Sequence, residues 1–204
     1  MRPAIALFAI MLGCSSPGRA VAGNPNVAMK IAGRGTVIIE LFPKEAPKTV
    51  DHFLALVRKK FYDGILIHRV VPGFVVQAGD PATRKYTPEK LGAMSDEELA
   101  QAGIGGGGSG HNIPFEVNAL THETGTLGIA LTAPRSATGD SQWFINLAPN
   151  HRLDGDYCVF GKVRTGMDVV NRIRKGDRIV SMREVTPPSK TSQKRRGKSG
   201  SAGR

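Results

Sequence analysis

The sequence contains 204 residues, 40% of them hydrophobic and 6% aromatic, with a formal net charge of +11. This length and composition suit one globular domain with a sizeable core. No run of 18 or more apolar residues occurs, which argues against a retained membrane-spanning helix.

The first 22 residues have the pattern of a signal peptide. Arg2 supplies a positive charge, and residues 4–12 form an apolar run as long as a signal-peptide core. Two processing routes stay open: lipidation of Cys14 in the lipoprotein-like box 11–14, or cleavage after the A-x-A site 20–22. A buried N-terminal helix is the alternative. Either route predicts an exported protein of the periplasm or cell envelope, lipid-anchored if Cys14 is acylated.

The next part of the chain, residues 23–187, is expected to be one mainly β domain. Eight short segments have strand character, and two stretches have helical spacing of apolar residues, the first of them led by Pro47. The expected strands are 27–31, 36–41, 66–71, 74–77, 127–131, 143–147, 159–163 and 178–183, and the helical positions are Val50, Phe53, Leu54 and Val57, then Met167, Val170 and Ile173. Many short strands with two helices favour a closed β-barrel whose ends the helices cover.

Residues 81–112 form a polar, glycine-rich segment that we interpret as an insertion loop. Ser95 and Glu98 make a capping-box pattern, which predicts a short helix from Asp96 to about Ala102. The glycine run 103–110 could suggest a phosphate-binding loop. It lacks the Gly-Lys-Ser/Thr ending of such loops, so flexible surface turns are the favoured interpretation.

The sequence pattern disfavours both a serine nucleophile and a metal site. Ser141 after Gly139-Asp140 could be a nucleophile with His68 and Asp80 as partners, but no glycine follows it and nothing marks an oxyanion hole. The five histidines show no metal-ligand spacing, so no metal site is expected.

The most informative block is residues 61–81. Pro72-Gly73 joins two strands, and alternate strand residues share a face, so Arg69 and Gln77 are expected to approach a common surface beside Phe74. An arginine inside such an apolar stretch is unusual. On pattern alone, a salt-bridged structural arginine and a functional one stay equally open.

This block resembles the signature of the cyclophilin family of peptidyl-prolyl cis-trans isomerases, with an His-Arg pair, Pro-Gly-Phe and Gln-x-Gly-Asp in order. Ile67 stands where that signature usually has phenylalanine. Further matching segments are 46–50 with Phe53, His122 with 125–128, 141–145, 153–155 and 159–163. The resemblance covers about residues 27–185. It implies a closed eight-stranded antiparallel β-barrel capped by two α-helices, an isomerase acting on proline-containing segments, and no cofactor.

The resemblance also implies roles for individual residues. Arg69 matches the catalytic arginine, and Gln77 matches the glutamine that orients it. The expected substrate-binding residues are Phe74, Val75, Phe144 and Leu153 for the proline ring, Thr132, Ala133 and Gln142 for the preceding residues, and Tyr157 for the substrate carbonyl.

Several positions depart from the family pattern. Val75 replaces a common methionine, Ala133 an asparagine that often contacts the peptide, and Tyr157 a common histidine. Arg152 stands where cyclosporin-sensitive members have tryptophan, which predicts weak cyclosporin binding. A cyclophilin barrel that binds proline segments of the cell envelope with little turnover is therefore kept as the alternative function.

The remaining expectations concern the cysteines and the C-terminus. Cys158 is expected to be a small buried residue without a disulfide partner. Residues 188–204 carry six positive residues (Lys190, Lys194, Arg195, Arg196, Lys198, Arg204), no acidic residue and little apolar character. They are interpreted as a solvated, disordered tail rather than a specific nucleic-acid or lipid contact, and a monomer is expected.

Overall fold

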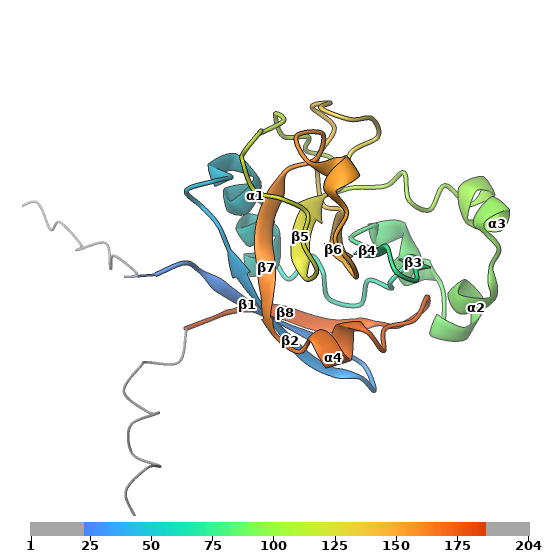
Figure 1. Ribbon diagram of the computed structural model, residues 1–204. Coiled ribbons are helices and arrows are strands. Elements are labelled where there is room, and N and C mark those ends of the chain that lie inside the picture. Colours follow the sequence, from blue (N-terminus) through green and yellow to red (C-terminus); the bar gives the residue numbers. More distant parts are fainter. Residues whose placement is uncertain (1–22, 187–204) are drawn as a thin grey trace, which may run out of the picture.

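The protein is represented by a computed structural model in which residues 23–186 are described. Its main feature is an eight-stranded antiparallel sheet curled into a half-barrel (Figure 1). The strands are β1 (Asn26–Ile31), β2 (Gly35–Leu41), β3 (Arg69–Val71), β4 (Val75–Ala78), β5 (Thr126–Ile129), β6 (Trp143–Asn146), β7 (Val159–Thr165) and β8 (Ile179–Val185). All eight expected strands are confirmed, although their ends differ from the expected ones.

The order of the strands is β3-β4-β6-β5-β7-β2-β1-β8. Within residues 23–186 no strand pairing joins β3 to β8, so the expected closure into a barrel is not shown. The segment before β3 makes an isolated bridge, between Leu66 and Arg178, and four backbone hydrogen bonds with residues 176–179 through Gly64, Ile65 and Ile67. These bonds make one isolated bridge and no continuous ladder, so the expected strand 66–71 shortens to β3.

The helix α1 (Pro47–Arg58) confirms the first helical pattern and contacts β8. Its apolar face joins the main core, where the ring of Phe53 lies 5.2 Å from Phe160 and 5.3 Å from Tyr62. Its N-cap residue offers no side-chain acceptor. The carboxylate of Glu116 accepts instead from the backbone N–H groups of Lys48 and Thr49, at 3.0 and 2.7 Å.

The second helix is shorter than the spacing predicted. The helix α4 (Met167–Val170) contacts β2, and Ile173 lies beyond its end. The backbone N–H groups of Arg172 and Ile173 bond three residues back, and Gly176 then turns the chain with a φ of 91°. These tighter turns stop the helix while leaving Val170 and Ile173 buried in the main core.

The insertion folds into helical segments and is not a loop throughout. It contains η1 (Pro81–Lys85), α2 (Pro88–Ala93) and α3 (Asp96–Gln101), with α2 and α3 on the opposite side of the molecule from α1 (Figure 1). The capping box at the start of α3 is confirmed by two hydrogen bonds between Ser95 and Glu98. Leu66 and Leu91 share a second apolar cluster with residues 94, 99 and 104, which attaches the insertion to the sheet.

The described residues also settle the cysteine prediction. Cys158 is free and 1% exposed, and burial raises the pKa of its thiol to about 12, so it is an inert core residue as expected.

None of the helices within residues 23–186 has the length and apolar character needed to cross a bilayer. The expected signal peptide, the lipidation site Cys14 and the basic tail 188–204 lie outside the described residues.

Candidate active site

The β3–β4 hairpin brings three of the expected site residues together. Phe74 N–H donates to Val71 O at 3.0 Å across the turn, and Gly73 takes a φ of 68°, which favours glycine. Arg69 and Gln77 are directly paired across the two strands, so their side chains share one face. Arg69 Nη1 donates to Gln77 Oε1 at 3.2 Å, which confirms the predicted approach.

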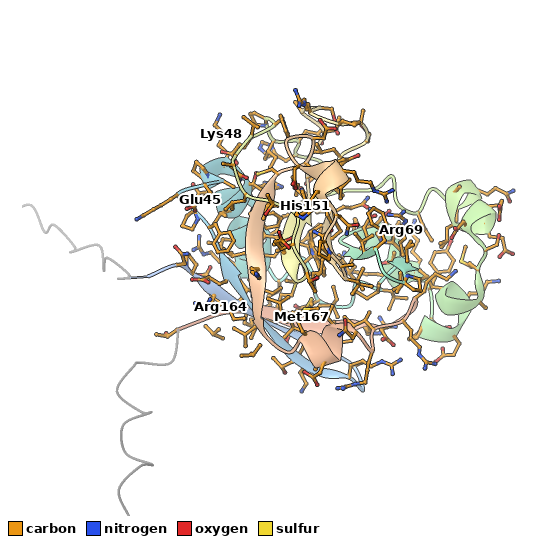
Figure 2. All side chains as sticks on the ribbon, viewed as in Figure 1. Glu45, Lys48, Arg69, His151, Arg164 and Met167 are labelled. Atoms are coloured by element: carbon orange, nitrogen blue, oxygen red, sulfur yellow. The ribbon has the colours of Figure 1, made fainter. Side chains whose placement is uncertain are left out.

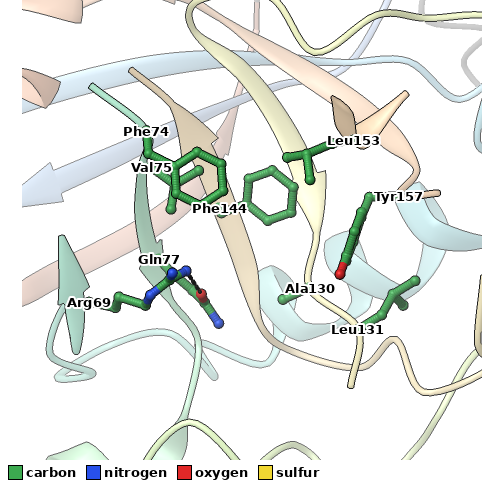
Figure 3. A pocket seen from close by; sticks show the side chains of 9 residues that line it. All are labelled: Arg69, Phe74, Val75, Gln77, Ala130, Leu131, Phe144, Leu153 and Tyr157. Carbon is green, nitrogen blue, oxygen red and sulfur yellow. Dashed lines mark hydrogen bonds between the residues drawn. The ribbon is translucent and has the colours of Figure 1, made fainter. Parts of the chain in front are cut away.

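A cavity of about 220 Å³ opens beside this pair. Figure 3 shows the rings of Phe74 and Phe144 and the side chains of Arg69 and Gln77 around it. The lining residues are Arg69, Phe74, Val75, Gln77, Ala130, Leu131, Phe144, Leu153 and Tyr157. The site is therefore a hollow lined mainly by apolar side chains, and Arg69 is the one cation among its lining residues.

Phe144 is held in place by its neighbours. His122 stacks on the ring at 5.6 Å with an interplanar angle of 16°, and Tyr157 meets it edge-on at 6.1 Å. His122 accepts from the Asn146 amide at Nδ1 and donates from Nε2 to the Tyr157 carbonyl, which suits the neutral tautomer. Burial lowers the pKa of His122, so the ring behind Phe144 is uncharged near neutral pH.

A chain of hydrogen bonds runs from the site arginine to the insertion. Gln77 Nε2 donates to Gln142 Oε1 at 3.1 Å. Gln142 Nε2 donates in turn to the carbonyls of Gly105 and Gly107 at 2.9 and 2.7 Å. The glycine run is thus connected to Arg69 through two glutamine amides, a contact that the sequence pattern did not predict.

The glycine run is not a phosphate-binding loop. The N–H groups of Gly105 and Gly107 donate to the carboxylate of Asp80 at 2.6 and 3.0 Å, so the protein itself occupies these donors. Asp140 accepts from Ser109 and from the N–H groups of residues 110 and 111. Burial alone would raise the pKa of Asp140, but these bonds and one from His52 hold it below its usual value.

Three expected substrate contacts do not line the cavity. Gln142 is 9% exposed and turned toward the glycine run, Thr132 is bonded to the Thr138 hydroxyl, and Ala133 is exposed. Ala130 and Leu131 line the cavity instead, and sequence reasoning missed them. The expected strand 127–131 placed both in a ladder, whereas β5 ends at Ile129 and leaves them at its margin.

The alternative serine nucleophile is excluded by the same geometry. Ser141 is fully buried, and its hydroxyl donates to the carbonyl of Gly79 at 2.7 Å. His68 is 4% exposed, and neither of its ring nitrogens has a hydrogen-bond partner among the described residues. No base therefore contacts this hydroxyl.

His68 predicts a specific dependence of stability on pH. Burial lowers its pKa to about 4, against an unfolded value of 6.5, so the unfolded chain binds this proton first. Stability is then full above about pH 6.5 and falls as the pH drops toward 4, by about 3 kcal/mol in total. We expect the melting temperature to fall over this range, and less steeply in His68→Leu and His68→Gln.

Two other groups with shifted pKa values, Asp63 and His122, can be distinguished from His68 in this measurement. The pKa of Asp63 is lowered by its hydrogen bond with Arg183, so its contribution is present above pH 4 and is lost only in more acidic solution. His122 shifts in the same direction as His68, which is why the difference between wild type and variant is the measurement. Equal slopes for wild type and both His68 variants would contradict the assignment.

Comparisons with known proteins point to one family. The family described as "Cyclophilin type peptidyl-prolyl cis-trans isomerase/CLD" matches residues 26–193. A "Peptidyl-prolyl cis-trans isomerase" of Synechococcus elongatus is 39% identical over 75% of this chain and 92% of its own length. A "Probable peptidyl-prolyl cis-trans isomerase" of Brucella suis is 38% identical over 85% of this chain and 83% of its own.

Solved structures with the same fold are also found. A cyclophilin-type isomerase of Cryptosporidium parvum superposes with a TM-score of 0.65 at 25% identity, covering 81% of this chain and 99% of that protein. A second structure of it, determined in the presence of the dipeptide Ala-Pro, gives a TM-score of 0.63 at 25% identity, with 79% and 99% coverage.

Proposed function

The chain belongs to the cyclophilin family of peptidyl-prolyl cis-trans isomerases, and on this premise we propose that Arg69 accelerates rotation of X-Pro bonds held in the cavity. The observation that carries the proposal is the position of the Arg69 guanidinium. It is bonded to Gln77 and lines the same cavity as the ring of Phe144. The Ala-Pro dipeptide named for the Cryptosporidium structure supports a proline-containing segment as the occupant.

The chemistry required of such a site is modest. Rotation of a peptide bond has a barrier of roughly 18–20 kcal/mol because resonance stiffens the C–N bond. A catalyst needs to bind the twisted amide better than either planar form and breaks no covalent bond. Acceleration by about five decades requires about 7 kcal/mol of such preference.

Arg69 is suited to supply part of this preference. In the twisted amide the prolyl nitrogen regains a lone pair, and a guanidinium N–H directed at that nitrogen stabilises it. Gln77 restrains one edge of the guanidinium, and no other hydrogen bond of the Arg69 side chain occurs among the described residues, so its other N–H groups stay available. Phe74, Phe144 and Leu153 would hold the proline ring.

The remaining assignments follow from the resemblance. Tyr157 would donate its hydroxyl to the substrate carbonyl from the cavity wall. Thr132, Ala133 and Gln142 would contact the residues before the proline, which requires Gln142 to exchange a bond with the glycine run for one with substrate.

The experiment is an isomerisation assay on short proline peptides with the purified protein. Line-shape or exchange NMR measures the cis-trans rate with and without protein, and the same spectra report peptide binding. We expect a rate that rises in proportion to protein concentration. Peptide binding without faster exchange would instead support the alternative, a low-turnover binding module of the cell envelope, which the missing side-chain contact at Ala133 leaves room for.

Weak cyclosporin binding is a further expectation. Cyclosporin-sensitive relatives carry tryptophan where this chain has Arg152. A bound apolar macrocycle would cover the charged guanidinium of Arg152 and remove part of its hydration, which costs free energy. Inhibition in the peptide assay is therefore expected only at high cyclosporin concentration. Tight inhibition would contradict this reasoning.

We also propose that the protein assists the folding of exported proteins from the periplasm or cell envelope, as a monomer with no specific nucleic-acid partner. The support is the signal-like pattern of residues 1–22. Palmitate labelling of the wild type but not of Cys14→Ala would support the lipid anchor. Absence of label from both would leave ordinary cleavage after residue 22 as the route.

A further inference from the structure

Two arginines approach the same aromatic ring at the edge of the cavity. The Cζ atom of Arg69 lies 5.6 Å from the centroid of Phe74, and that of Arg152 lies 4.5 Å from it. Arg152 belongs to η2 (His151–Leu153) and immediately precedes Leu153, which lines the cavity together with Phe74. Arg152 therefore borders the cavity without being one of its lining residues.

Neither guanidinium has a carboxylate partner among residues 23–186. The acidic residues near Arg152 in sequence are engaged elsewhere. Asp154 accepts from the N–H of His122 at 2.7 Å and pairs with His151 at 3.0 Å, and Asp156 pairs with Arg135 at 2.9 Å. The margin of the cavity therefore carries two positive charges that no described acid neutralises, which attracts anions.

The contact with Phe74 gives Arg152 a defined place despite its exposure. A cation over an aromatic face is held by the ring quadrupole, and the guanidinium keeps its N–H donors free because it makes no hydrogen bond with the described part of the chain. Arg69 is assigned to the amide nitrogen. Arg152 is thus the cation left to meet a substrate side chain next to the proline.

We propose that Arg152 is a specificity-determining residue that favours proline segments carrying Asp or Glu beside the proline. This inference rests on the proposed function and adds a substrate class to it. The positive margin attracts a carboxylate side chain adjacent to the bound ring and repels a lysine in the same place.

The expected preference for acidic peptides is modest, because Arg152 is exposed and would pair with the substrate carboxylate in contact with solvent. An ion pair in contact with solvent changes a binding or rate constant by about threefold, and repulsion of lysine acts by a similar factor. The ratio of kcat/KM for Glu over Lys peptides is therefore about tenfold at low salt. It falls toward one near 1 M salt, where the screening length is about 3 Å.

The experiment compares peptides that differ only in Glu, Gln or Lys, placed either directly before or directly after the proline. The proteins are wild type, Arg152→Gln, Arg152→Glu and, as a matched loss of one exposed positive charge, Lys48→Gln on α1. Figure 2 shows Lys48 and Arg69 far apart across the molecule. At one of the two positions we expect the Glu-to-Lys ratio to be retained in Lys48→Gln, lost in Arg152→Gln and inverted in Arg152→Glu.

The outcomes separate this proposal from the one on which it rests. A Glu-to-Lys ratio near one in wild type at both positions, or the same ratio in Arg152→Glu, overturns the role of Arg152 even when isomerisation is fast. Should no peptide be isomerised, the proposed catalysis fails. In that case NMR titration of the same proteins gives the ratio of the affinities for Glu and Lys peptides. An affinity ratio near one in wild type at both positions, or an unchanged ratio in Arg152→Glu, would then overturn the role of Arg152.

Discussion

Arg69→Ala is expected to lower kcat/KM for proline peptides by about 100- to 1,000-fold, because it removes the donor assigned to the twisted amide. Loss of one preorganised transition-state donor typically costs about 2.7–4 kcal/mol. The apolar lining of the cavity is untouched by the change, so peptide affinity should fall much less than the rate. The measurement pairs exchange rates with binding curves from the same NMR titration.

Two further variants make the result specific to the guanidinium. Arg69→Lys keeps the positive charge but loses the planar donor that bonds Gln77, so an intermediate rate is expected. Lys48→Gln removes an exposed charge on the distant α1 and should match wild type. Equal rates for Arg69→Ala and wild type would refute the assigned chemistry and leave a binding function.

The part of the site that the sequence predicts well is local. Arg69 and Gln77 lie on neighbouring strands joined by the three-residue turn 72–74, so strand alternation and the short turn place them on one face. The capping box of α3 is equally local, since Ser95 and Glu98 are three residues apart. Short-range geometry of this kind depends on residue order and little on the rest of the fold.

The features that sequence reasoning missed depend on contacts between distant segments. The N-terminus of α1 is satisfied by Glu116, 67 residues beyond Thr49. The bonds of Gln142 with the carbonyls of residues 105 and 107 were not predicted, since the resemblance implies only a substrate contact for this residue. No spacing rule connects these segments, so only tertiary structure brings the partners together.

The need for a glycine at position 128 also arises from contacts between distant segments. Gly128 pairs with Phe144 across β5 and β6, and the Phe144 ring occupies the space where a side chain at position 128 would lie. A Cβ atom added at this position would stand within 3.0 Å of three carbons of the Phe144 ring. Real side chains do not approach this closely, so either the ring or the strand must move.

Gly128→Ala is expected to destabilise the protein by about 1–3 kcal/mol and to weaken peptide binding about tenfold or more. His122 stacks on Phe144 at 5.6 Å, so the ring has little room to move away from the cavity and would be displaced into it. The free energy of unfolding from urea titration reports the strain, and NMR titration with a proline peptide reports the loss of the hollow. Gly106→Ala is the matched control, because a Cβ there would make only an ordinary 3.6 Å contact with Gly103.

A second substitution tests whether contact with the Phe144 ring causes the loss of stability in Gly128→Ala. Phe144→Leu removes the ring atoms that the new methyl group would strike, so Gly128→Ala should cost less stability in that background than in wild type. The coupling free energy between the two sites is expected to be about 1–3 kcal/mol, as for other directly packed pairs. Strictly additive costs would mean that the strain at position 128 arises from the strands rather than from Phe144. The floor of the cavity would then not depend on this glycine, and the proposed displacement of the ring would be wrong.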